Sequence, residues 1–140
     1  MLWSALLGKR AQQGFIPTVA AVTATYEAAL FCAPQKCRVT QVDFVPRTAV
    51  TGNDTNTKNL NVIFKNGDGS GSTEVGNLDL PTGVNLTALD LKNIPLNAIY
   101  LTSGVEMEAG DVLTLQFEEV NSGVAIPNLM TLVTWEPARA

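Results

Sequence analysis

The sequence contains no histidine and only two cysteines, Cys32 and Cys37. Without histidine there is no imidazole general base, no Ser/His/Asp or Cys/His pairing, and no zinc site of the usual Cys/His kind. An enzyme built on this chain would have to use carboxylates, lysines or a bound metal. These absences favour a protein that is not an enzyme, and we expect no catalytic residue, no metal and no cofactor.

Long apolar runs are also missing, since none approaches the roughly 20 residues that a membrane helix needs. The first seven residues are apolar, but Lys9 and Arg10 follow them, whereas an export signal carries its positive charges in front. Basic residues are few and scattered, and the net charge is -4, which disfavours duplex binding through phosphate neutralisation. We therefore expect no membrane, no export and no nucleic acid.

What the chain does have is enough apolar material for a core. Hydrophobic residues make up 46% of 140 residues and charged residues 16%, which is typical of one folded domain. Short runs of Val, Thr, Ile and Phe alternate with Gly, Asn, Asp and Pro, the spacing typical of β-sandwiches and barrels. In residues 111–118, apolar and polar side chains alternate, so one face of this strand is expected to be buried.

The same alternation recurs in residues 58–65 and 38–45. Residues 129–135 are apolar on both faces apart from their threonines, which predicts a central strand or a subunit interface. Residues 86–96 fit either a short helix or an irregular crossing. Further strands are expected at 17–23, 27–32, 73–80 and 97–102. About eight antiparallel strands predict an all-β fold, a single jelly-roll-like β-sandwich.

Residues 1–15 precede the first strand signal and are unusually apolar for a solvated segment. We interpret them as an N-terminal arm on a β-sandwich domain of residues 16–140. The arm either docks on a neighbouring molecule or covers an open edge of its own sheet, because exposed edges need protection. Its apolar side chains are the candidate interface residues: Leu2, Trp3, Leu6, Leu7 and Phe15.

Charge is distributed unevenly along the chain. Residues 1–65 carry seven Lys/Arg and three Asp/Glu, whereas residues 66–140 carry two and ten. If the fold kept the two halves on different faces, copies could meet head to tail with complementary potentials. If strands from the two halves intermix in one sandwich, no such polarity results. Both arrangements fit the sequence.

Three segments could carry chemistry. Residues 66–74 begin like a calcium loop, but the twelfth position is Asn77 instead of a bidentate Glu, so a Gly/Ser hairpin loop is the favoured interpretation. The acidic residues between 106 and 119 are interpreted as a solvated rim, and not as the converging carboxylates of a glycosidase. Cys32 and Cys37 flank a turn-like connector that allows a hairpin disulfide or two reduced thiols.

The apolar arm, the strands rich in Thr, Val and Asn, and the Glu-Ala-Gly-Asp-Val-Leu-Thr-Leu run at 108–115 before one last strand resemble small jelly-roll virion proteins of tailed bacteriophages, including head decoration or cement proteins. The resemblance implies a structural protein, made in the host cytoplasm and located on the capsid surface of the virion. Its partner would be the major capsid protein, and it would form a homo-oligomer, with a homotrimer favoured.

The alternative function is a carbohydrate-binding β-sandwich module, or another virion role such as an adhesin, head-fibre or tail component. Sugar binding needs aromatic side chains presented on a surface, and aromatics are only 6% of the chain. Those outside the predicted core faces are Trp3, Phe15, Tyr26, Phe31, Tyr100 and Trp135.

Overall fold

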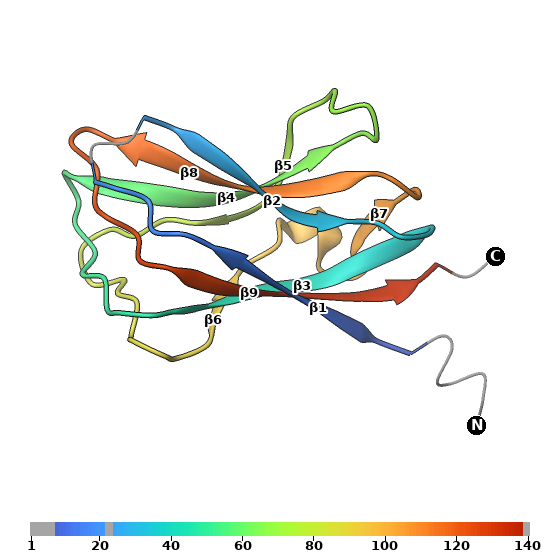
Figure 1. The fold of residues 1–140 in the computed structure, drawn as a ribbon, viewed down its shortest axis with the longest axis horizontal. Helices are drawn as coiled ribbons and strands as arrows, with labels where there is room; N and C mark the ends of the chain where they lie inside the picture. The colour runs from blue at the N-terminus through green and yellow to red at the C-terminus, as the bar shows by residue number, and fades with distance from the viewer. Residues whose placement is uncertain (1–7, 22–23, 139–140) are drawn as a thin grey trace.

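The computed structural model describes residues 8–21 and 24–138. This part of the chain forms nine strands and one 3-10 turn, arranged as two antiparallel sheets packed face to face (Figure 1). The strands are β1 (Arg10–Ile16), β2 (Tyr26–Cys32), β3 (Cys37–Pro46), β4 (Thr57–Lys65), β5 (Thr73–Leu78), β6 (Lys92–Ile94), β7 (Val105–Met107), β8 (Val112–Val120) and β9 (Leu129–Pro137), with the turn η1 (Ala98–Tyr100) between β6 and β7.

The strand order identifies the sandwich as a jelly roll. Sheet I has the order β1-β9-β3-β6, with β7 also paired to β3, and sheet II has the order β2-β8-β4-β5. The first strand therefore pairs with the last, the second with the last but one, and β3 with β6 and β7, while β4 and β5 form the innermost hairpin. A long antiparallel hairpin rolled into two sheets has this order. The predicted all-β sandwich is confirmed.

The core lies between the two sheets and is built by the predicted alternation. Phe44 and Val133 from sheet I face Leu115 and Phe117 from sheet II, and all four are fully buried. The Phe31 and Trp135 rings, from opposite sheets, have their centroids 6.0 Å apart. Burial of each such side chain stabilises the fold by about 1.5–3 kcal/mol. These side chains all come from the inner faces of the two sheets.

Six of the predicted strands are present: 27–32, 38–45, 58–65, 73–80, 111–118 and 129–135 correspond to β2, β3, β4, β5, β8 and β9. The strand predicted at 97–102 is wrong. Asn97 fixes a turn there instead, because its side chain donates to the Glu74 carbonyl and its own carbonyl accepts from the Tyr100 amide. The strand predicted at 17–23 is also not found: within 17–21, Val19 makes an isolated bridge to Ile126, and residues 22–23 lie outside the described part.

The N-terminal arm differs from the prediction. Residues 10–15, assigned to the arm, belong to β1 and form an edge strand that pairs with β9 from Arg10↔Trp135 to Ile16↔Leu129. This strand had no period-two signal because Ala11, Gln12 and Gln13 are all exposed. For residues 10–15, the alternative that the segment covers an edge of its own sheet is therefore correct.

Candidate interaction surface

The outer face of sheet I carries apolar side chains that the core does not use. In the antiparallel register, Phe15 on β1 lies opposite Met130 on β9, and Met130 lies opposite Val45 on β3. Directly opposite residues share a face of the sheet. Leu91 immediately precedes β6, and continuation of the Lys92↔Phe44 pairing places it beside Val45. We call these four residues, Phe15, Met130, Val45 and Leu91, the apolar row.

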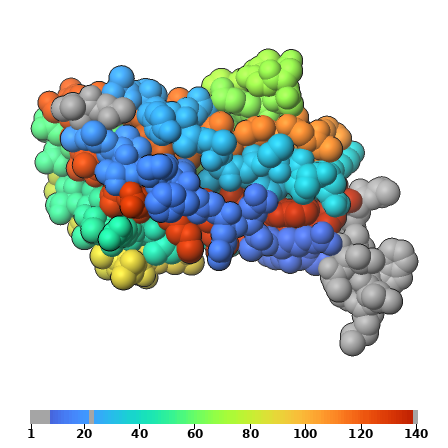
Figure 2. All heavy atoms as spheres, in the orientation of Figure 1, coloured from blue at the N-terminus to red at the C-terminus, as the bar shows by residue number. Residues whose placement is uncertain are grey.

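The apolar row is open to solvent. Phe15 is 67% exposed, Leu91 54% and Met130 39%. Leu89, 76% exposed, extends the row, and its backbone amide donates to the Pro46 carbonyl at the end of β3. Figure 2 shows β1 and β9, in blue and red, side by side on the surface of the molecule. Isolated exposed apolar residues are ordinary, but a row that runs across β1, β9 and β3 to Leu91 is a candidate interaction surface.

Polarity increases along the same face away from the apolar row. The next row contains Asp43, whose carboxylate accepts hydrogen bonds from Gln41 Nε2 at 2.8 Å and Asn93 Nδ2 at 2.9 Å. At the far end of the sheet, the Arg38 guanidinium forms an ion pair with Glu136. The apolar row therefore occupies the end of sheet I where β1 ends, and charged groups occupy the end where β1 begins.

The outer face of sheet II has a different character. Asn77 on β5 donates to Asn61 on β4, and Asn61 donates to Gln116 Oε1 on β8 at 3.0 Å. Asn59 Nδ2 donates to Glu118 Oε1 at 3.0 Å in a neighbouring row. These amide and carboxylate side chains form hydrogen bonds with one another across the strands. The outer face of sheet II therefore presents hydrogen-bonded polar side chains, whereas the outer face of sheet I carries an exposed apolar row at one end.

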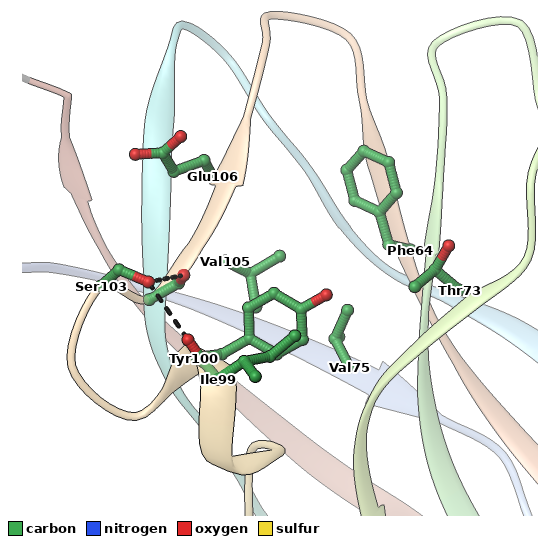
Figure 3. A pocket seen from close by; sticks show the side chains of 9 residues that line it. Phe64, Thr73, Val75, Ile99, Tyr100, Ser103, Val105 and Glu106 are labelled. Atoms are coloured by element: carbon green, nitrogen blue, oxygen red, sulfur yellow. Dashed lines mark hydrogen bonds between the residues drawn. The ribbon is translucent and has the colours of Figure 1, made fainter.

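A hollow of about 380 Å³ opens at the edge between β5 and β7 (Figure 3). Tyr100 and the exposed Ile99 stand on one side and Phe64 on the other, and Ser103 and Glu106 lie at its rim. The Ser103 hydroxyl is turned back to the Ile99 and Gly104 carbonyls. This set of groups could contact a small polar ligand such as a sugar ring, but its two aromatic side chains, Phe64 and Tyr100, are partly buried and stand on opposite sides of the hollow.

Among the five candidate interface residues, Phe15 belongs to the apolar row. Leu2, Trp3, Leu6 and Leu7 lie outside the described residues. The structure therefore brings Phe15 together with three residues that sequence reasoning did not single out. The signal for Met130 was present, because residues 129–135 were apolar on both faces. Only the strand register shows that Val45 lies beside Met130 and that Leu91 lies beside Val45.

The other candidate aromatic residues do not form a platform. Phe31 and Trp135 are buried in the core. Tyr26 is 43% exposed and stacks on Phe117 with a centroid distance of 6.2 Å. Tyr100 lines the hollow, and Trp3 lies outside the described residues.

The loop at 66–72 is the connector of the β4–β5 hairpin and projects beyond the sheets in Figure 1. The Asp68 carboxylate accepts hydrogen bonds from the Ser70 amide and hydroxyl, which lower its pKa. Asn66 closes the loop through backbone bonds with Gly69 and Ser70. Within residues 8–21 and 24–138, no three His, Cys, Asp or Glu side chains gather as a metal-ligand group.

The acidic residues separate as strand alternation predicts. Glu118 faces outward and accepts from Asn59, whereas Glu119 points inward with Phe117 and has a buried Oε1 without a hydrogen-bond partner. Lys58, opposite Glu119 on β4, is fully buried and donates from Nζ to the Ala21 carbonyl at 2.7 Å. Burial lowers the pKa of Lys58, and Glu119 opposes that shift. Sequence reasoning missed this inward-facing pair.

The two cysteines are free thiols, so the reduced alternative is the observed one. Cys32 ends a strand of sheet II and is exposed, whereas Cys37 begins a strand of sheet I and is buried. Burial, with a smaller contribution from the Asp111 charge, raises the pKa of the Cys37 thiol. A raised pKa keeps the thiol protonated and unreactive.

The two halves of the sequence are interleaved in space. First-half strands β3 and β4 pair with second-half strands β9 and β8. Lys36 and Arg38 accordingly form ion pairs with Glu108 and Glu136 of the second half. Intermixing, the second of the two arrangements expected from the sequence, is therefore the one observed.

Over the described part of the chain, no helix is long and apolar enough to span a membrane. Comparison with protein-family models, curated proteins and solved structures found no match to this chain.

Proposed function

We propose that this protein is a non-enzymatic virion subunit that decorates a viral capsid, binding the outer surface of the major capsid protein shell and stabilising it. The observation that carries the proposal is the apolar row, which lies exposed on one outer face of a jelly roll while the other outer face is polar and self-satisfied. Jelly rolls occur in viral coat proteins and in lectins. Because fold alone does not specify function, the choice depends on the surface.

The apolar row favours assembly over sugar recognition. Only one of its four members is aromatic, and the row runs across β1, β9 and β3 to the residue before β6, which suits a broad protein contact with an apolar centre. The hollow beside Tyr100 is lined by two partly buried aromatic side chains, Phe64 and Tyr100, which stand on opposite sides and form no stacking platform. In this proposal the row joins copies into an oligomer, and the oligomer contacts several capsid subunits at once. Modest contacts then add through avidity.

The test is co-sedimentation with shells that lack this subunit, prepared by deleting its gene from the virus that encodes it. Wild-type protein is expected to bind saturably and to raise the temperature at which the shells break. Met130→Glu, which puts a charge in the apolar row, is expected to reduce binding about tenfold or more through lost avidity. Thr73→Glu, at an exposed strand position of sheet II, is the matched control and should bind like wild type.

Wild-type protein that fails to sediment with the shells would refute the capsid proposal. Equal binding by wild type and Met130→Glu would show that the apolar row does not contribute to capsid binding.

A further inference from the structure

The hollow between β5 and β7 has an apolar lining that continues into the core. Val75 and Val105, one from each strand, line it and are buried. Tyr100 and Phe64, on its two sides, are partly buried against the core. The exposed Ile99 side chain lies beside Tyr100 (Figure 3). The hollow therefore offers apolar contacts that the rest of the described chain does not fill.

The charge at the rim of the hollow is negative. Glu106 of β7 is exposed there, and no lysine or arginine is among the residues that line the hollow. In the strand register Glu106 lies opposite Arg38 of β3, but Arg38 forms its ion pair with Glu136 of β9. Among the described residues, Glu106 therefore has no ion-pair partner. An anionic ligand would be repelled at this rim, and a cationic one would be attracted.

A long basic side chain matches both properties of the hollow. Lysine and arginine bury an aliphatic stem along apolar surface and keep a charged head in water. In the hollow the stem would contact Tyr100 and Ile99, and the head would lie near the carboxylate of Glu106 at the rim. We propose that the hollow binds a lysine or arginine side chain of a partner protein.

The open shape of the hollow favours a side chain over a free small molecule. Sites for small molecules enclose about 70–90% of the ligand surface. Here Ile99, Ser103 and Glu106 are exposed, so a free ligand would keep much of its surface in water. A side chain held on a partner gains its remaining contacts from the rest of the interface. The inference concerns a different surface from the apolar row and does not rest on capsid binding.

The experiment follows backbone amide signals of the full-length, isotope-labelled protein by NMR during titration with three probes. Nα-acetyl-arginine methylamide carries both stem and charge, its citrulline analogue carries the stem with a neutral head, and methylammonium chloride carries the charge without the stem. The arginine probe is expected to bind saturably, in the millimolar range, and to shift the amides of residues 99–106. The citrulline probe should bind about threefold or more weakly, which is what an exposed ion pair contributes. Methylammonium should give no saturable shift.

Two matched pairs of variants separate the charge from the apolar wall. Glu106→Gln should weaken binding of the arginine probe about threefold, whereas Glu108→Gln removes the same charge outside the hollow and should bind like wild type. Ile99→Ser should weaken binding about threefold through lost burial of the stem. Leu101→Ser, beside the same turn but outside the lining, should not. All four side chains are exposed, so each variant should keep the spectrum of the folded protein.

Three results would overturn the inference: no saturable shift with the arginine probe, equal binding of the arginine and citrulline probes, or an equal loss in Glu106→Gln and Glu108→Gln. Agmatine, a free cation with the same stem and guanidinium group, tests the source of the ligand. Agmatine binding tenfold tighter than the arginine probe would overturn the assignment to a partner protein and favour a free organic cation. Because no shells are used, failure of these titrations would leave the capsid proposal standing.

Discussion

Close backbone approach at Gly123 closes the end of the sandwich where Lys58 and the Oε1 atom of Glu119 are buried. Gly123 has a φ of 66°, in the region that favours glycine. A Cβ atom at this position would lie 2.1 Å from the Ala21 carbonyl oxygen and 2.9 Å from Lys58 Nζ. Any other residue at position 123 would therefore have an unfavourable backbone conformation and a steric clash. Its presence also allows Lys58 Nζ to reach Ala21, the bond that satisfies a buried ammonium group.

We predict that Gly123→Ala lowers the free energy of unfolding by about 2–3 kcal/mol, from backbone strain and from displacement of the Lys58 contact. The matched control is Gly69→Ala, since Gly69 has a φ of 82° and a Cβ atom added there would meet nothing within 4 Å. The control should cost about 1 kcal/mol, the conformational part alone. Urea denaturation measures both values. Equal losses in the two variants would contradict the steric role of Gly123.

Strand elements differ in how far the sequence could predict them. Strands whose inner side chains are apolar and whose outer side chains are mainly polar, such as β3, β4 and β8, were found because that arrangement appears in the sequence as period-two alternation. The edge strand β1 was missed because its side chains from Ala11 to Gln13 are exposed on both sides of the sheet. The strands β6 and β7 were missed because three residues are too short to show a period. Met130 of the apolar row could be predicted, because the β9 sequence is apolar on both faces. Val45 and Leu91 could not be placed beside it, because the strand register is known only from the folded sheets.

The connectors differ in a way that can be tested by insertion. The loop at 66–72 is exposed and bonded mainly to itself. The loop at 33–36 is tied to its surroundings, because the Ala33 amide and carbonyl pair with Asp111 and Gly110, and the Lys36 carbonyl accepts from Ala138. Tolerance to insertion depends on the burial and bonding of the affected backbone.

We predict that four Gly/Ser residues inserted after Gly69 change the free energy of unfolding by less than about 1 kcal/mol, the loop-closure cost alone. The same insertion after Pro34 should cost about 2–3 kcal/mol through the lost backbone bonds. Thermal unfolding is expected to show a fall of several degrees for the second variant and little change for the first. The opposite ranking would show that the 66–72 loop, and not the 33–36 loop, holds the sheets together.

At the scale of the whole molecule, the chain does not keep its charge division after folding. The basic half and the acidic half contribute alternate strands to the same sheets, and several of their charges neutralise one another locally. A head-to-tail attraction between a positive and a negative face therefore has no structural basis in the described residues. In the function proposed above, association of copies therefore rests on the apolar row, whose side chains are exposed.

The salt dependence of association distinguishes these two driving forces. Between 50 mM and 500 mM NaCl the screening length falls from about 14 Å to about 4 Å, which weakens contacts between exposed charges. Association driven by complementary faces should weaken tenfold or more over this range. Association driven by apolar burial should change less than about threefold, because added salt does not diminish it. For the proposed oligomer we predict the second behaviour, measured by sedimentation equilibrium. A tenfold loss of association would show that contacts between charged groups, and not the apolar row around Met130, hold the copies together.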